Sequence, residues 1–271
     1  MQNLRKLASV LSLFTFEQPE LTGSEVATLL KRPKSTVYRT LNAIAAAGFL
    51  DHDRETGHYR LGIRLASLGE IARQSTSLQR LAHAALTRVT AATGEMSTVM
   101  VQTGKQGVNI EVVESRQVLM LPGLVGTPQP LHASAGGKTI LAAENDEAVT
   151  KMFTWPLERF TRSTITDRKR FLAELAQVRR IGYGTSWGEH AGDIVGAGAP
   201  VRDHRAVVIA AMTVGCPQTR ATPATMTLMI RTIVAEADRL SRALGFQGAP
   251  PVLPAKLPNI ERAGALALGR R

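Results

Sequence analysis

The chain has 271 residues, with 33 Lys and Arg against 22 Asp and Glu, and a formal net charge of +11 at pH 7. Its hydrophobic fraction of 44% provides for a packed core and excludes a wholly disordered chain. No apolar run reaches the roughly 18 residues of a membrane span, no secretory signal opens the chain, and the single cysteine, Cys216, excludes an internal disulfide. We therefore expect a cytoplasmic protein with no membrane partner.

The positive charge is spread thinly along the chain. Residues 1–75 hold ten basic and seven acidic side chains, a net charge of only +3. Within them, residues 26–50 hold four basic side chains and no acidic one. Where basic residues lie decides nucleic-acid binding more than their total does, so residues 26–50 are the candidate segment.

The first sixty residues predict three helices followed by a hairpin. Apolar residues at helical spacing predict an amphipathic helix over 4–14. A short helix over 25–30 has Ser24 as its expected N-cap, and a third helix runs from 34 to 47, with Gly48 as its stop. Two short strands, around 49–52 and 58–61, flank a turn that contains Gly57. This order is typical of a winged helix-turn-helix.

The third helix has the two faces that DNA recognition requires. Val37, Leu41 and Ile44 form an apolar face, and Arg39 and Asn42 lie opposite. In a major groove an arginine reads guanine edges and an asparagine reads adenine, while shorter polar and basic side chains contact phosphates. An ordinary three-helix domain with a solvated helix remains the alternative at this point. The predicted DNA-binding residues are Lys34, Ser35, Thr36, Tyr38, Arg39, Asn42 and Arg60.

The rest of the chain predicts a second, α+β domain. Helices are expected over 62–74, 78–93, 135–143, 168–181 and 225–244, and strands over 97–102, 108–113, 118–121, 195–201 and 206–214. We expect four parts: a DNA-binding domain (1–62), a linker helix (63–77), a sensor domain (78–247) and a flexible tail (248–271).

Several motifs together resemble one family. The run from Lys34 to Leu41, Gly48-Phe49-Leu50 and Tyr59-Arg60-Leu61-Gly62 is similar to the winged helix of IclR-type transcriptional regulators. Residues 131–138, 181–186, Glu189 and 199–203 resemble the effector-domain motifs of the same family, in the same order. The resemblance implies a two-domain α+β fold, with an N-terminal winged helix-turn-helix and a C-terminal GAF-like effector-binding domain.

The resemblance also implies a small organic acid as effector. Small residues in the glycine-rich segment 134–138 would let an anion approach backbone N–H groups at a helix start, although a loop-to-helix junction without ligand remains open. Three of the family's pocket positions hold small residues here, so we expect a roomy, weakly polar pocket that suits larger or aromatic acids. The carried-over effector-binding positions are Ala135, Gly136, Ser186, Gly196, Thr213 and Gly215.

The leading hypothesis is a ligand-responsive transcriptional regulator that binds a pseudo-palindromic, double-stranded DNA operator as a dimer or tetramer. A non-specific architectural DNA-binding protein is the first alternative, motivated by the charge alone. A small-molecule enzyme with an accessory DNA-binding module is the second, motivated by Cys216, His190 and the nearby carboxylates of Glu189 and Asp193. We expect no catalytic residue, no metal and no cofactor, because these groups have no spacing typical of a catalytic or metal site.

Overall fold

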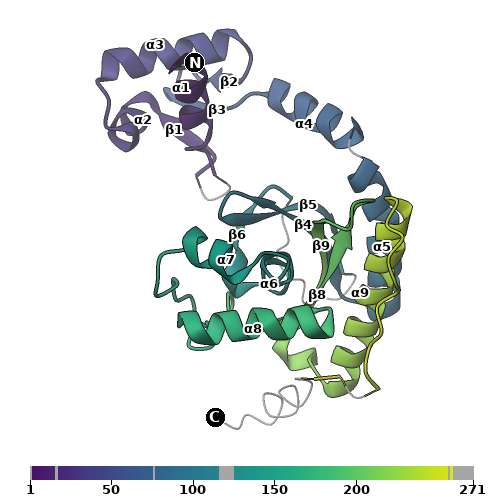
Figure 1. The fold of residues 1–271 in the computed structure, drawn as a ribbon. Coiled ribbons are helices and arrows are strands. Elements are labelled where there is room, and N and C mark those ends of the chain that lie inside the picture. Colours follow the sequence, from purple (N-terminus) through teal and green to yellow (C-terminus); the bar gives the residue numbers. More distant parts are fainter. Residues whose placement is uncertain (1, 16–17, 76, 116–124, 256, 259–271) are drawn as a thin grey trace. The chain divides into compact units, whose positions relative to one another are not determined.

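The computed structural model describes residues 2–15, 18–75, 77–115, 125–255 and 257–258. Contacts within the chain divide it into two units, residues 1–76 and residues 77–271 (Figure 1). The strand expected over 118–121 lies outside the described residues. Within them, no helix is long and apolar enough to cross a membrane.

The first unit contains the predicted three helices and hairpin, with one further strand. A three-stranded antiparallel sheet has the order β1-β3-β2, so β3 lies in the middle. The first helix ends earlier than expected. The elements are α1 (Gln2–Leu11), β1 (Glu20–Thr22), α2 (Gly23–Leu30), α3 (Lys34–Ala46), β2 (Leu50–His52), β3 (His58–Leu61) and α4 (Ile63–Ser75).

The start of α2 corrects the expected cap. Thr22, not Ser24, is the N-cap, since its hydroxyl accepts a hydrogen bond from the Glu25 N–H at 3.3 Å. The Glu25 carboxylate in turn accepts one from the Thr22 N–H at 2.7 Å. This capping box starts the helix earlier than Ser24 would, because Thr22 ends an extended strand in the backbone conformation of an N-cap.

The second unit is built on a six-stranded antiparallel sheet of order β6-β5-β4-β9-β8-β7. Its short elements β6, β7 and α7 were not expected as separate elements. The bounds are α5 (Ser77–Thr93), β4 (Met96–Thr103), β5 (Gln106–Val113), β6 (Pro128–Pro130), η1 (Leu131–Ala133), α6 (Ala135–Leu141), α7 (Asp146–Met152), α8 (Arg168–Ile181), β7 (Gly184–Trp187), β8 (Ile194–Arg202), β9 (Val208–Pro217), η2 (Gln218–Arg220) and α9 (Pro223–Ala243).

Helices cover both faces of this sheet (Figure 1). On one face, Val99, Val195 and Met212 pack with apolar side chains of α5 and α9. On the other, Met100 and Ala211 pack with side chains of α6, α7 and α8. Successive strand residues therefore face two separate cores, as the pleat of a β-strand requires. The two-domain α+β architecture is confirmed.

Part of the segment after α9 packs against the rest of the second unit. Leu257 is buried in the core beside α9. The Tyr183 hydroxyl donates to the Pro258 carbonyl at 3.3 Å, and the Arg231 guanidinium donates to the Ala255 carbonyl at 3.2 Å. Ala255, Leu257 and Pro258 therefore have contacts with the rest of the second unit, because apolar side chains of this Pro-rich stretch cover a hydrophobic face. The flexibility expected over 248–271 stays a prediction. Residues 256 and 259–271 lie outside the described part.

Candidate DNA interface and effector pocket

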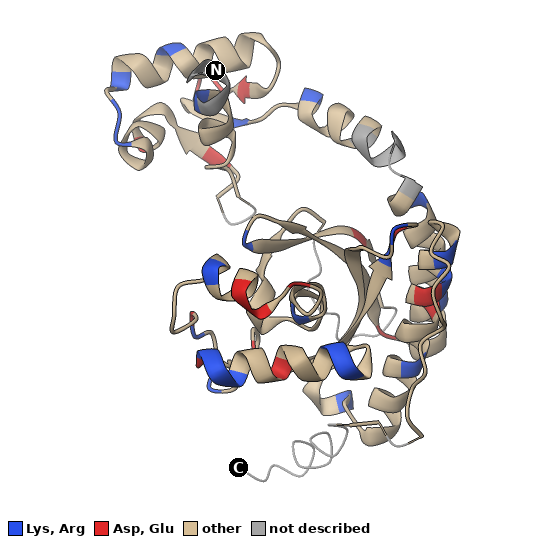
Figure 2. Cartoon of the chain, in the orientation of Figure 1, with Lys and Arg blue, Asp and Glu red and all other residues tan. Residues whose placement is uncertain are grey.

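The polar face of α3 is exposed, as the spacing predicts. Lys34, Ser35, Arg39 and Asn42 are exposed, while the apolar side chains at 37, 41 and 44 are buried in the core of the first unit. The helix contains no acidic residue, and Figure 2 shows its basic positions on an otherwise uncharged helix. A helix of this kind can present donors and cations to the major groove.

Tyr38 and Thr36 are more restricted by their neighbours than the other predicted DNA-binding residues of α3. A Cβ atom at Gly23 would lie 2.5 Å from the Tyr38 ring, so this ring packs closely on the start of α2. Thr36 is half-buried, and its carbonyl accepts a hydrogen bond from the Thr40 hydroxyl at 2.9 Å. Arg60 is exposed on β3, where it lies 3.7 Å from the carboxylate of Asp51.

A contact across the first unit fixes Asn42. The hydroxyl of Tyr59, a fully buried residue of β3, donates to the Asn42 amide oxygen at 3.1 Å. The Tyr59 ring stacks on His52 at 4.1 Å, and burial raises the pKa of the tyrosine hydroxyl. No partner of the Asn42 NH₂ group is found among the described residues, and the amide oxygen has a second lone pair, so the amide can still read an adenine from a fixed orientation. The sequence did not reveal this contact, because the two residues are 17 positions apart.

Two further cations lie beside α3. Lys6 of α1 and Arg32 of the turn before α3 are both exposed, and both line a hollow of about 500 Å³ next to Thr36 and Thr40. Their side chains extend the basic surface that residues 26–50 predict.

All six predicted effector positions line one pocket in the second unit, with a volume of about 280 Å³. We call it the effector pocket. Ala135 and Gly136 come from the start of α6, and the other four come from β7, β8 and β9. Gly136 approaches the sheet so closely that a Cβ atom there would lie 2.6 Å from the Thr213 methyl group.

Polar side chains of β4 and β5 also line this pocket, and they were missed. The hydroxyls of Thr98 and Thr213 lie 2.7 Å apart, and Thr98 donates to the Asn109 amide oxygen at 3.3 Å. No partner of the Asn109 NH₂ group is found among the described residues, so it provides donors in the pocket. Asn109 is one of three polar side chains in β5, with Gln106 and Glu111, so no signal in the sequence distinguished it. The pocket therefore combines a small group of polar side chains with mostly apolar walls.

The side-chain hydroxyls around the start of α6 already form hydrogen bonds within the protein. Ser134 is the N-cap, and its hydroxyl accepts from the Gly137 N–H at 3.1 Å. The Ser186 hydroxyl donates to the Ala133 carbonyl at 3.1 Å. These bonds fix the segment that carries Ala135 and Gly136 against the sheet.

The loop between β7 and β8, at the rim of the pocket, is anchored by a buried ion pair. Glu189 is 3% exposed, and its Oε1 lies 2.7 Å from the ammonium of the fully buried Lys138. The Lys138 ammonium also lies 3.0 Å from a Glu174 carboxylate oxygen. Burial raises the pKa of Glu189, and no hydrogen-bond partner of its Oε2 is found among the described residues.

Two neighbours of Glu189, His190 and Ala191, line the pocket. The Thr164 hydroxyl donates to the Glu189 carbonyl at 2.6 Å, which fastens the loop from a second side. Burial lowers the pKa of His190 and favours its neutral form. No cluster of three His, Cys, Asp or Glu side chains able to hold a metal is found in the described part of the chain.

Comparison with known proteins decides the family. The model of the bacterial transcriptional regulator IclR C-terminal domain matches residues 71–242, and that of the IclR helix-turn-helix domain matches residues 4–54. The chain belongs to the IclR family. It is a ligand-responsive transcriptional regulator, as the sequence motifs predicted.

Relatives of this IclR-family regulator include named regulators of Escherichia coli. It is 27% identical to HTH-type transcriptional regulator XynR of strain K12 over 91% of this chain and 98% of XynR. It is 26% identical to HTH-type transcriptional repressor AllR of the same strain over 84% of each chain.

Solved structures of IclR homologues share the fold. One from Microbacterium hydrocarbonoxydans, complexed with 4-hydroxybenzoate, is 25% identical, with a TM-score of 0.76, and the match covers 89% of this chain and 99% of that one. A regulator from Silicibacter sp. TM1040 is 24% identical, with a TM-score of 0.82, and the match covers 93% of this chain and 100% of that one.

In this IclR-family chain a hollow rich in aromatic residues adjoins the effector pocket and shares Pro128, Gln129 and His190 with it. Its volume is about 650 Å³, and Phe153 and Phe160 lie on its walls. His190 meets the Phe160 ring edge to face at 5.0 Å. The effector pocket therefore has an aromatic rim on the side of His190.

Proposed function

We propose that this regulator binds a pseudo-palindromic operator as a dimer or tetramer, and that a small organic acid, aromatic acids included, changes its operator affinity. The observation that carries the proposal is the convergence of six motif-derived positions on one pocket, in a different unit from the exposed polar face of α3. A bacterial regulator of this kind acts on the chromosome, so we place it in the cytoplasm.

The proposed DNA contacts follow from exposure and chemistry. Arg39 and Asn42 would reach base edges, with Tyr59 holding the Asn42 amide, while Lys34, Ser35, Thr36, Tyr38 and Arg60 would contact the backbone. One helix covers only a few base pairs, so useful specificity requires two half-sites and therefore two copies of the chain.

Exposed apolar side chains support self-association of the first unit. Leu61, Ile63, Leu68 and Ile71, at the end of β3 and along α4, are 45%, 78%, 45% and 63% exposed. Large apolar side chains gathered on one short segment are typical of an interaction surface. A second copy of the chain would cover them in the dimer that the two half-sites demand.

The pocket chemistry suits an acid with a planar body. The Asn109 NH₂ group and the backbone of Ala135 and Gly136 would meet the carboxylate, and Met96, Met100 and Ile194 provide apolar walls. The relative that binds 4-hydroxybenzoate supports an aromatic acid as one candidate. The acid can change operator affinity only if it binds one conformation of the regulator more tightly than another.

The test is the Arg39→Ala variant on duplexes selected in vitro with the wild-type protein. A good bidentate base contact contributes about 1–3 kcal/mol, so we expect a loss of roughly ten- to a hundredfold in affinity by fluorescence anisotropy. Binding of benzoate and 4-hydroxybenzoate, measured by calorimetry, should not change. Arg180→Ala, at another exposed arginine on α8, is the matched control. Wild-type operator affinity in Arg39→Ala would refute the assignment of α3.

The same proteins, duplexes and acids distinguish a regulator from the two alternative functions. An architectural DNA-binding protein would bind random and selected duplexes equally, with a steep salt dependence. An enzyme would convert the acid, whereas a regulator returns it unchanged after binding.

A further inference from the structure

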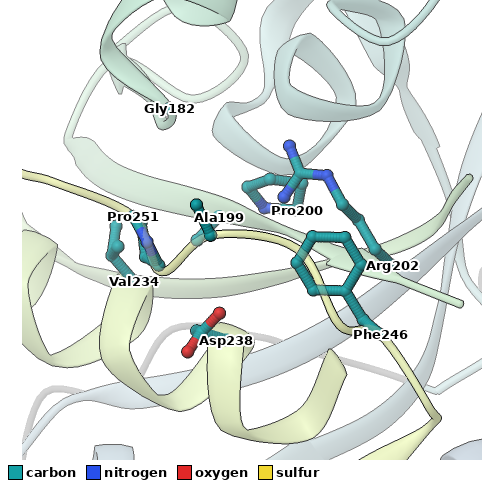
Figure 3. Close-up of a pocket in the computed structure, with 9 residues that line it drawn as sticks. Gly182, Ala199, Pro200, Arg202, Val234, Asp238, Phe246 and Pro251 are labelled. Carbon is teal, nitrogen blue, oxygen red and sulfur yellow. The ribbon is translucent and has the colours of Figure 1, made fainter. Parts of the chain in front are cut away.

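A separate hollow in the second unit is lined by an arginine, Arg202. It lies beside β8 and α9, has a volume of about 290 Å³ and shares no lining residue with the effector pocket. Figure 3 shows Arg202 and Phe246 on one wall, with Val234 and Pro251 on the others. The Arg202 backbone N–H donates to the Ser241 hydroxyl at 2.9 Å, which fixes its Cα position.

The Arg202 guanidinium forms no ion pair within the described part of the chain. The residue is half-buried, and burial lowers the pKa of its guanidinium. No hydrogen bond or ion pair from this group is found to any residue that the structure describes. Its guanidinium carbon lies 5.7 Å from the centroid of the Phe246 ring, and the Asp238 carboxylate acts on it only through a longer-range charge interaction. Charges removed from water are normally paired, and a guanidinium has five donors to satisfy. The site therefore has an unmet preference for an anion.

The carboxylate in the same hollow does not meet this preference. Asp238 of α9 lies 2.8 Å from the Arg242 guanidinium and forms an ion pair with it. Figure 3 shows the Asp238 carboxylate away from the Arg202 guanidinium. Because Asp238 is neutralised by Arg242, it opposes an incoming anion only weakly.

The other walls are apolar and well anchored. Val234, Phe246, Ala249 and Pro251 surround the space next to the guanidinium. The segment that carries the last three is tied to α9, since the Arg242 guanidinium donates to the Gly248 carbonyl at 3.3 Å. A ligand here would place a charged head on Arg202 and an apolar body against these walls.

We propose that this hollow is a second binding site, for a small organic carboxylate with an apolar body, distinct from the effector pocket. The carboxylate accepts hydrogen bonds from the Arg202 guanidinium, for which a planar two-oxygen acceptor is the best match. The body packs on Phe246 and Pro251. The competing interpretation is that Arg202 only holds Phe246 in place, in which case no acid binds.

The experiment uses the full-length protein labelled with 4-fluorophenylalanine and observed by ¹⁹F NMR, with benzoate as the probe. The chain has seven phenylalanines, and the Phe246 resonance is identified by its loss in Phe246→Leu. We expect a saturable shift of this resonance with benzoate. A charge-assisted contact predicts roughly tenfold or greater weakening in Arg202→Gln. Arg202→Lys keeps the charge but loses the planar fork, so intermediate weakening is expected.

Two controls separate this site from the effector pocket and from general effects. Gly196→Leu places a larger side chain in the effector pocket and should leave the Phe246 shift unchanged. Arg180→Gln should bind like the wild type, since that arginine is exposed outside the hollow. A Phe246 resonance that benzoate does not move overturns the proposal, and so does wild-type affinity at Phe246 in Arg202→Gln.

Discussion

At the scale of single residues, the buried cation of Lys138 connects two acidic side chains of the second unit. It has no exposed side-chain surface, and it holds Glu189 and Glu174 together. Lys138→Met leaves both carboxylates without their cation, so we expect the free energy of unfolding to fall by about 3–5 kcal/mol, measured with chemical denaturant. Lys151→Met, which breaks an exposed pair with Glu147, should change it by less than about 1 kcal/mol. Equal effects would contradict the buried cluster.

The same cluster predicts a pH dependence. Burial raises the pKa of Glu189 above its usual value, so the folded state binds this proton more tightly than the unfolded state does. The stabilisation that comes from binding this proton is therefore complete at pH values below the usual glutamate pKa. It is lost as the pH rises through the pKa of Glu189 in the folded state. Glu189→Gln has no such proton, so the variant should gain stability relative to wild type across that window. Unfolding curves of both proteins at several pH values would show this change. A variant whose stability relative to wild type increases as the pH falls would contradict it.

Cys216 illustrates how burial decides reactivity. The thiol is fully buried at the end of β9, and burial raises its pKa to about 12. Since the thiolate is the nucleophile, we expect the native protein not to react with iodoacetamide near neutral pH and the urea-unfolded protein to react fully. Mass spectrometry of the alkylated chain measures both. Rapid native alkylation would reopen a redox or catalytic role for this cysteine.

At the scale of elements, the effector pocket depends on the close approach of α6 to the sheet. A Cβ atom at Gly198 would lie 3.0 Å from the carbonyl carbon and oxygen of Ala135. Gly198→Ala should therefore push the start of α6 away from β8, lower the free energy of unfolding by about 1–3 kcal/mol and weaken acid binding. Gly192→Ala, where a Cβ atom would meet nothing within 4 Å, is the matched control. Calorimetric titration with 4-hydroxybenzoate measures the change, and unaltered binding in Gly198→Ala would contradict it.

Elements with a long, regular pattern were predicted well from the sequence. The helix expected over 168–181 has those bounds in α8, because Phe171, Leu175 and Val178 mark one face and Gly182 ends it in the left-handed conformation. β1, β6 and β7 have only three or four residues each, too few for a period to show. Their existence depends on pairing with distant strands, which local sequence does not encode.

The residues of the candidate sites also divide into those that the sequence predicted and those that it did not. The exposed face of α3 follows from helical spacing, and the family motifs brought six pocket positions together. Thr98 and Asn109 were not found, because their place in the pocket depends on the register between β4 and β5, where a bulge follows Val99. The buried partners of Lys138 were not found either, since 36 and 51 positions separate them from it in sequence.

At the scale of the whole molecule, the net charge of +11 is a poor guide to function. Only +3 of it belongs to residues 1–75, and Figure 2 shows basic residues on elements of both units. The two units also have separate cores, one around Leu41 and Tyr59 and the others on the two faces of the large sheet. Each unit therefore has a core of its own, and a proposed effector site in one unit can act on a proposed DNA-binding face in the other only if the two units are coupled.

That coupling gives the last prediction. If an acid changes operator affinity by some factor, the operator must change acid affinity by the same factor, because both describe one thermodynamic cycle. We expect residues 77–271, produced alone, to bind 4-hydroxybenzoate as the full chain does without DNA. Adding operator to the full chain should then change acid affinity by about 5- to 150-fold, the usual range of allosteric coupling. Calorimetry for the acid and anisotropy for the operator measure the two factors independently. An acid affinity that the operator leaves unchanged would contradict this coupling. An isolated sensor unit that binds no acid would show that the acid does not act through the pocket at the start of α6.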